Sequence, residues 1–255
     1  MLKSGLAVAV LAVGLSARAE PAQTLFTPDL TVGASLGTIF SRAIAVTAPG
    51  YDAKVRRVSG TGDYRVTDRN PLRPVFDMDY LYDGRPAGKG KVEIDLRTGE
   101  NCFEGKCAID TSASGLLFNP FLWGKPPAKL KVGDHWQVTL GQPWELGPAG
   151  QQTVTVLAIE GDAVTLERKG ESSGPLDGEA KTIDLTSDGK SATFSVTPGL
   201  ARWSGYTLFR AGRVVSDELL VRRDLTLTGA DGKTVPAVER QYILLNAAPP
   251  GAPLS

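Results

Sequence analysis

Residues 182–196 read TIDLTSDGKSATFSV, and two independent features of this stretch predict a β-hairpin. Asp188-Gly189 is a dipeptide typical of two-residue type I′ turns. A two-residue loop at this point sets Ile183 opposite Phe194 on one apolar face and places their polar neighbours on the other face. Because the turn chemistry and the apolar–polar alternation agree, we expect an antiparallel pair of strands here.

The same analysis predicts two further hairpins downstream. In the later hairpin, which turns at Asp231-Gly232, the predicted register sets Arg223 opposite Arg240 on the apolar side. Like charges directly opposite each other are unfavourable. We therefore expect a bulge, a sheet edge or an opening to solvent at that point. The expected turns are Ala211-Gly212, which pairs Leu208 with Val215, and Asp231-Gly232, which pairs Leu225 with Val238, Val221 with Tyr242 and Leu219 with Leu244.

Two upstream segments also alternate, and their apolar residues are all even-numbered. A two-residue loop at Asp83-Gly84 would pair even with odd positions and bury charges, so we expect an odd-length loop or a bulge within residues 83–88. Helix signals are weak, with short helical turns expected at residues 35–45 or 111–118. The even-numbered apolar residues of the two alternating segments are Phe76, Met78, Tyr80, Tyr82, Val92, Ile94 and Leu96. Further strands are expected at residues 136–140, 153–159 and 163–168.

These patterns predict an all-β fold. The expected architecture is a large curved antiparallel meander sheet that closes into a half-barrel or barrel, with a two-sheet sandwich as the alternative. We expect one β domain over residues 20–246. Its possible halves are 20–124 and 129–246, separated by the loop Gly124-Lys125-Pro126-Pro127, and residues 247–255 form a flexible tail.

Residues 1–19 match a secretory signal peptide. Lys3 precedes an apolar run over residues 5–15, and Ala17-Arg18-Ala19 is a small-x-small cleavage site. A membrane-spanning helix needs about 20 apolar residues, so no transmembrane anchor is expected in the mature chain. The sequence therefore predicts a periplasmic or secreted protein, cleaved at about Ala19.

The charge balance argues against a polyanionic partner. The chain has 28 basic and 28 acidic residues, and removal of residues 1–19 takes away only Lys3 and Arg18. Because basic residues form no run, a nucleic-acid partner has no electrostatic support.

The two cysteines, Cys102 and Cys107, are expected to form a disulfide, because exported proteins meet an oxidising compartment. The C-x4-C spacing encloses Gly105 and fits a bridge across the base of a hairpin tip. A redox pair or half of a metal site is the alternative, but thioredoxin-like pairs use C-x-x-C and metal sites need more ligands nearby.

Catalytic motifs are not recognisable in the sequence. His135 is the only histidine, and the side-chain alternation of the strand expected there places it on the outer face. Ser187 to Lys190 match S-x-x-K, but that chemistry needs a helix start and this stretch is the predicted hairpin turn. We therefore predict no catalytic residues, no metal and no cofactor.

Four carboxylates on two neighbouring segments are the remaining candidate for chemistry. Asp77, Asp79, Glu93 and Asp95 could bind a hard cation or act as a glycosidase pair. The structural alternative, which we favour, is a solvated outer face neutralised by Lys89, Lys91 and Arg97.

The segment GLLFNPFLW, residues 115–123, is unusually apolar and is broken by Pro120. It predicts either a loop that plugs one end of the sheet or an apolar contact surface for a lipid-like ligand or partner. Trp144 and Trp203 could line such a cavity. The candidate ligand-binding residues are Leu116, Leu117, Phe118, Phe121, Leu122 and Trp123.

Together these features favour a non-enzymatic cell-envelope protein that holds an apolar ligand or a protein partner in a curved β-sheet. In outline it resembles the half-barrel periplasmic carriers of lipid-modified proteins, a likeness of architecture alone. The alternatives are a structural or assembly component of the cell surface, acting through sheet edges, and a carboxylate-dependent hydrolase.

Overall fold

A computed structural model describes residues 25–109, 116–140, 149–173, 181–249 and 251. Within them, one antiparallel sheet holds all the named strands, so the curved-sheet prediction is confirmed and the sandwich is not observed. Its strands are β1 (Ser35–Thr47), β2 (Lys54–Asp68), β3 (Val75–Tyr82), β4 (Arg85–Asp95), β5 (Glu100–Phe103), β6 (Lys106–Ile109), β7 (His135–Leu140), β8 (Gly150–Glu160), β9 (Ala163–Ser173), β10 (Thr182–Ser187), β11 (Lys190–Arg210), β12 (Arg213–Thr228) and β13 (Thr234–Ala248); a short helix, α3, spans Pro120–Trp123.

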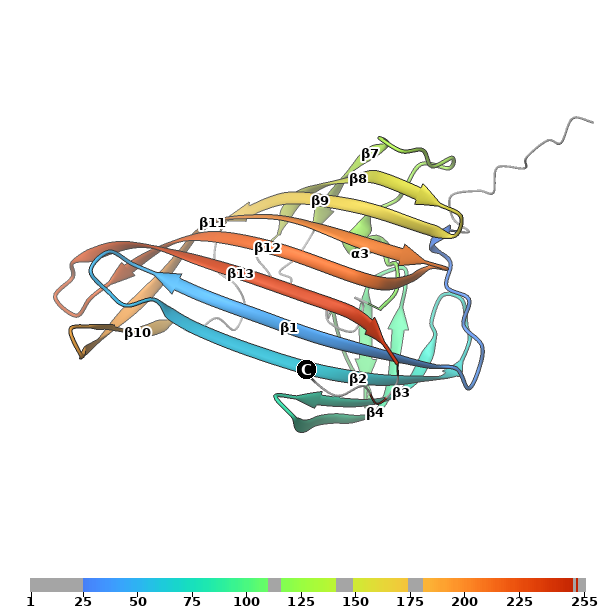
Figure 1. Cartoon of the computed structure of the whole chain (residues 1–255), viewed down its shortest axis with the longest axis horizontal. Helices are drawn as coiled ribbons and strands as arrows, with labels where there is room; N and C mark the ends of the chain where they lie inside the picture. Colours follow the sequence, from blue (N-terminus) through green and yellow to red (C-terminus); the bar gives the residue numbers. More distant parts are fainter. Residues whose placement is uncertain (1–24, 110–115, 141–148, 174–180, 250, 252–255) are drawn as a thin grey trace, which may run out of the picture.

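Two meanders make up this sheet, and they meet where the first strand pairs with the last. The spatial order is β6-β5-β4-β3-β2-β1-β13-β12-β11-β9-β8-β7, with β10 paired to β11 outside this path. Figure 1 shows the long strands lying side by side as one curved sheet. The two edge strands, β6 and β7, are consecutive in the chain, and residues 116–123 between them cross the inner face from one half of the sheet to the other.

The hairpin of residues 182–196 forms with the predicted register. Ile183 lies opposite Phe194, and Asp188 and Gly189 both have positive φ, as a type I′ turn requires. The β3–β4 pair also confirms its prediction. A register shift lies between Tyr80 and Leu81, so Ala87 is the extra residue that keeps Phe76 opposite Val92.

The register predicted for β12 and β13 is wrong by one residue. Leu225 pairs with Ala237 and Arg223 pairs with Glu239, so the expected Arg223–Arg240 pair does not form. Residues 229–233 connect Thr228 to Thr234 as a five-residue loop, and an odd loop length moves every pair by one position. The corrected pairs for the other two predicted partners are Val221–Gln241 and Leu219–Ile243.

The Ala211-Gly212 turn forms, but its register holds only next to the turn. A shift between Leu208 and Phe209 places Leu208 opposite Ser216, so the predicted Leu208–Val215 pair is wrong. Phe209 takes the place opposite Val214. The bulge adds one residue to β12 and re-aims the strands beyond it.

The helical turn expected at residues 35–45 is also wrong. This segment is strand β1, which pairs with β2 on one side and β13 on the other. Ladder hydrogen bonds to two neighbours outweigh a weak helical tendency. At the other end, β13 continues to Ala248, so Ala247 and Ala248 pair with Thr38 and Gly37 instead of belonging to a tail.

Two of the three core clusters of the described residues contain side chains of the segment 116–123. Leu116 and Leu117 pack in one cluster with residues of β2, β3 and β4. Phe118, Leu122 and Trp123 pack in a second cluster with residues of β7, β8, β9, β11, β12 and β13. The crossing segment therefore contacts both halves of the sheet.

No helix in the described part of the chain is long and apolar enough to cross a membrane. The predicted signal peptide, most of the residues 111–118 expected to be helical, and Trp144 lie outside the described residues. Export and the division into halves stay predictions.

Candidate ligand-binding site

The crossing segment, residues 116–123, is held against the inner face by polar contacts at its helical end. Asn119 caps α3, because its Oδ1 accepts a hydrogen bond from the Leu122 backbone N–H at 3.0 Å. Trp136 Nε1 donates to the Trp123 carbonyl oxygen at 2.6 Å, and Gln152 Nε2 donates to the Leu122 carbonyl oxygen. These donors come from β7 and β8, so the segment is fixed to the C-terminal half of the sheet.

Trp123 is the centre of this attachment. Its side chain is 1% exposed, and its ring meets Phe209 edge to face with centroids 5.1 Å apart. The Arg168 guanidinium lies 4.7 Å from the ring centroid, within the range of a cation–π interaction. Arg168 in turn forms a 2.5 Å ion pair with Asp217, whose other oxygen accepts from Thr207 Oγ1 at 2.6 Å. Burial of this arginine is therefore compensated by a carboxylate and an aromatic face.

The N-terminal half of the inner face is covered less completely, and a cavity of about 370 Å³ remains there. Inner side chains of the C-terminal half, such as Val154 and Leu166, are fully buried. By contrast, several inner side chains around the cavity are only partly buried although they are large and apolar. The lining residues are Thr38, Phe40, Tyr64, Met78, Tyr80, Ala87, Gly88, Val92, Asn101, Phe103, Lys106, Leu116 and Leu245.

Glycines at inner positions of β2 and β4 are covered by aromatic side chains beside this cavity. A Cβ on Gly60 would lie 2.5 Å from the Tyr80 hydroxyl, and one on Gly62 would lie 2.6 Å from the Tyr64 ring. A Cβ on Gly90 would lie 3.1 Å from the Phe103 ring. Aromatic rings therefore lie over glycines, which protects the exposed backbone and leaves a smooth apolar floor.

Only one of the six candidate ligand-binding residues reaches this cavity. Leu116 lines it, whereas Leu117 is fully buried in the N-terminal cluster. Phe118, Leu122 and Trp123 are buried in the C-terminal cluster, and Phe121 packs partly buried against it. Ligand binding by this set stays a prediction. Sequence reasoning missed the other lining residues, which are dispersed over seven strands.

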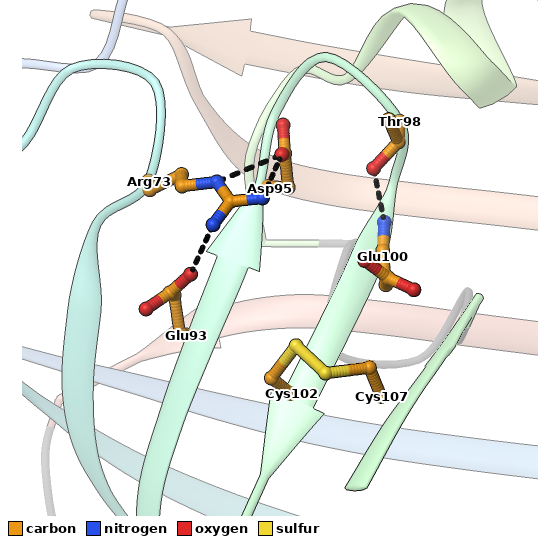
Figure 2. Close-up of a disulfide and its surroundings, with 7 residues drawn as sticks. All are labelled: Arg73, Glu93, Asp95, Thr98, Glu100, Cys102 and Cys107. Carbon is orange, nitrogen blue, oxygen red and sulfur yellow. Dashed lines mark hydrogen bonds and ion pairs between the residues drawn. A yellow bond between two sulfur atoms is a disulfide. The ribbon is translucent and has the colours of Figure 1, made fainter. Parts of the chain in front are cut away.

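The Cys102–Cys107 disulfide is present and joins β5 to β6 (Figure 2), at the edge of the sheet beside the cavity. The two cysteines face each other across the hairpin, and so do Phe103 and Lys106 at its tip. Because side chains alternate along a strand, the bridge lies on the outer face while Phe103 and Lys106 lie on the inner face. Glu100 lies near both sulfurs, but bonded sulfurs offer no thiolate for a metal.

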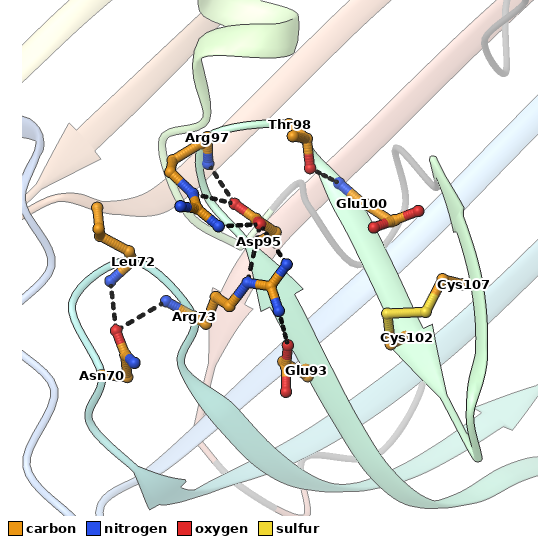
Figure 3. Close-up of polar contacts among 10 residues, drawn as sticks. All are labelled: Asn70, Leu72, Arg73, Glu93, Asp95, Arg97, Thr98, Glu100, Cys102 and Cys107. Atoms are coloured by element: carbon orange, nitrogen blue, oxygen red, sulfur yellow. Dashed lines mark hydrogen bonds and ion pairs between the residues drawn. A yellow bond between two sulfur atoms is a disulfide. The ribbon is translucent and has the colours of Figure 1, made fainter.

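Asp95, at the end of β4, forms ion pairs with Arg73 in the β2–β3 loop and with Arg97 in the β4–β5 loop. Arg97 Nη2 lies 2.7 Å and Arg73 Nη2 2.9 Å from Asp95 Oδ2, and the Arg97 backbone N–H donates to Oδ1 at 2.9 Å. Arg73 also reaches Glu93 at 3.2 Å (Figures 2 and 3). The loop that presents Arg73 is itself shaped by Asn70 Oδ1, which accepts from the backbone N–H of Leu72 and Arg73 (Figure 3).

These contacts set the pKa of Asp95 well below its usual range. The side-chain hydrogen bonds from Arg97 are the largest cause, followed among the lowering effects by the Arg97 backbone N–H and by Arg73, and together they outweigh the opposing effect of burial. A carboxyl with a depressed pKa stabilises the folded state fully above its unfolded pKa, about 3.9, and this stabilisation is lost as the pH falls toward the folded pKa.

We expect Asp95→Asn to lower the free energy of unfolding at pH 7 by about 2 kcal/mol, since it removes charge-assisted hydrogen bonds. The difference from wild type should shrink at pH 3, where the wild-type advantage is partly titrated. Urea unfolding of both proteins at the two pH values measures it. Asp79→Asn is the control, because the Asp79–Lys89 pair is exposed and should change stability little. An equal difference at pH 7 and pH 3 would contradict the account.

The other carboxylate and histidine candidates do not form a catalytic arrangement among the described residues. Asp77 and Asp79 line an open pocket together with Lys89 and Lys91, and Asp79 pairs with Lys89 at 3.0 Å. Glu93 is engaged by Arg73, as described above. His135 is exposed on the edge strand β7. Ser187 and Lys190 flank the β10–β11 turn, as the hairpin predicted, and Trp203 is buried with its Nε1 donating to Gln152.

Comparison with known proteins yields only distant likenesses. No protein-family model matches the chain, and no curated sequence matches it. A lipovitellin structure, described for its lipid–protein interactions, aligns over 90% of this chain with a TM-score of 0.38 and 11% identity, and the chain spans 27% of it.

Two outer-membrane proteins align less well. Neisserial surface protein A aligns over 83% of this chain and 96% of its own length, with a TM-score of 0.24 and 6% identity. A loop-deletion mutant of OmpT from Vibrio cholerae aligns over 86% of this chain and 100% of its own, with a TM-score of 0.24 and 10% identity. With scores and identities this low, none of the three establishes a shared fold or function.

Proposed function

We propose that this protein is an exported, non-enzymatic component of the cell envelope that holds an apolar small molecule in the inner cavity. The observation that carries the proposal is the contrast between the two halves of the inner face. The crossing segment packs in the C-terminal cluster, but it leaves Phe40, Met78, Tyr80 and Phe103 only partly buried around a space of about 370 Å³.

The size and chemistry of the cavity suit a small apolar ligand. Small-molecule sites measure about 300–1,000 Å³ and are lined mainly by apolar and aromatic side chains with few polar groups. This cavity has that composition, with Thr38, Asn101 and Lys106 as its most polar lining residues. Export is supported by the sequence of residues 1–19 alone.

A chain-length series of linear alcohols tests the proposal directly. Each buried methylene contributes about 0.8 kcal/mol, so affinity should rise about fourfold per methylene until the cavity is full and then level off. Displacement of Nile red, a neutral fluorescent probe, from the purified protein measures the affinities. Equal affinities across the series, or no probe binding, would contradict the proposal.

A cavity-filling substitution locates the ligand. A Cβ on Gly88 would lie 3.4 Å from Met78 Cε, an ordinary contact, and the longer side chain of Gly88→Leu extends into the cavity. We expect Gly88→Leu to weaken alcohol binding at least tenfold. Lys89→Leu adds the same side chain at the next position, which faces outward beside Asp79, and should leave binding unchanged. Equal binding by both variants would place the ligand elsewhere.

A further inference from the structure

The inner cavity has one charged lining residue, and that residue is cationic. Lys106 is the charged residue among its lining residues. A second cavity of about 190 Å³ shares the lining residues Thr38 and Leu116 with the first, and its charged lining residues are Arg210 and Arg213. Both apolar spaces are therefore bordered by cationic side chains, although the chain as a whole is neutral.

From this we infer that the ligand is an anionic single-chain amphiphile whose head group binds at Lys106, an inference that rests on the proposed function. Lys106 and Phe103 are directly opposite each other at the tip of the β5–β6 hairpin, on the same face. The apolar chain of the ligand lies against Phe103 and the cavity floor. The Lys106 ammonium group then meets a carboxylate or phosphate at the mouth, where the head group keeps part of its water.

The hairpin tip presents Lys106 in a fixed position. Glu104 and Gly105 both have positive φ, which is the geometry of a tight two-residue turn, and the Cys102–Cys107 bridge closes the hairpin behind it. Among the described residues, no carboxylate forms an ion pair with Lys106. The carboxylate of Glu104 lies at the same tip, with Oε1 3.6 Å from the position of a Cβ on Gly90. Its negative charge repels an anionic head group, so substitution of Glu104 serves as a control.

The second cationic border is a weaker candidate for the head group. Arg210 already lies 3.9 Å from Asp162, and the cavity beside it is about half the size of the first. Arg213 lines the same second cavity, so its substitution distinguishes a head group bound there from one bound at Lys106. The assignment to Lys106 predicts that loss of Arg213 leaves affinity unchanged.

The test compares dodecanol, dodecanoate, dodecyl phosphate and dodecylammonium as competitors for Nile red on the full-length mature protein. We expect both anions to bind more tightly than the alcohol and the cation. Lys106→Gln should weaken dodecanoate binding about threefold and Lys106→Glu about tenfold, as for a solvent-exposed ion pair, and dodecanol binding should change less in both variants. Glu104→Gln should strengthen dodecanoate binding, and salt should reduce all these differences.

The outcomes separate this inference from the proposed function. Tighter binding of dodecyl phosphate than of dodecanoate identifies a phosphate head group, and the reverse order identifies a carboxylate; both support the inference. Equal binding of all four compounds, unchanged by Lys106→Glu, would overturn it while leaving an apolar site. A loss confined to Arg213→Gln would overturn the assignment to Lys106. No displacement by any compound would overturn the proposed function itself.

Discussion

Trp123→Ala is expected to lower the free energy of unfolding by about 4 kcal/mol, because truncation of a buried tryptophan leaves a large cavity. The substitution removes the edge-to-face contact with Phe209 and the aromatic face above Arg168. Arg168 has 5% of its side chain exposed, so it would lose part of its compensation while staying buried. Urea unfolding followed by circular dichroism measures the change.

Trp123→Phe is the matched control. The smaller ring keeps a face for Arg168, and it removes an indole N–H that has no hydrogen-bond partner among the described residues. We expect Trp123→Phe to cost about 1 kcal/mol or less, because loss of a buried unsatisfied donor offsets part of the lost contact area. Equal destabilisation by alanine and phenylalanine would show that the ring face does not hold the crossing segment.

Glu239→Leu is expected to destabilise the protein by about 3 kcal/mol, because it removes a carboxylate from beside a buried arginine. Arg223 is 1% exposed, and its Nη1 lies 3.9 Å from Glu239 Oε1. The same oxygen accepts from Gln241 Nε2 at 2.5 Å, and Gln241 Oε1 accepts from Arg42 Nε at 2.9 Å. The network crosses β12, β13 and β1 where the two meanders join.

The double variant Arg223→Met, Glu239→Leu tests the cause. Replacement of both charges by apolar side chains is often neutral, since no buried charge is left unpaired. We expect the double variant to recover most of the stability lost in Glu239→Leu. Urea unfolding of wild type, both single variants and the double variant gives the coupling energy. A double variant no more stable than Glu239→Leu would contradict a coupled pair.

The strand pattern was predictable because each local signal agreed with the sheet. At residues 182–196 the turn dipeptide and the alternation specify the same register, and at β3–β4 the even-numbered apolar residues required the bulge that forms. The β12–β13 register failed because Asp231-Gly232 is part of a five-residue loop instead of the whole turn. The unfavourable Arg223–Arg240 pair was a sign of that error, since the true partner is Glu239.

The cavity was not predictable from the apolar segment of residues 115–123. Phe118, Leu122 and Trp123 pack in the C-terminal cluster, and the cavity lies in the N-terminal half, where Leu116 borders it. Which half stays open depends on the β1–β13 pairing, which joins residues about 200 positions apart. A local signal did exist in Gly60-x-Gly62 and Gly88-x-Gly90, because glycines at alternate inner positions mark a strand face with no side chains.

Native mass spectrometry of the protein, purified without detergent from cells that produce it, shows whether a small molecule occupies the inner cavity. We expect a bound small molecule on wild type and on Lys89→Leu, and a bare chain for Gly88→Leu. Bare chains for all three proteins, or the same bound mass on Gly88→Leu, would contradict it.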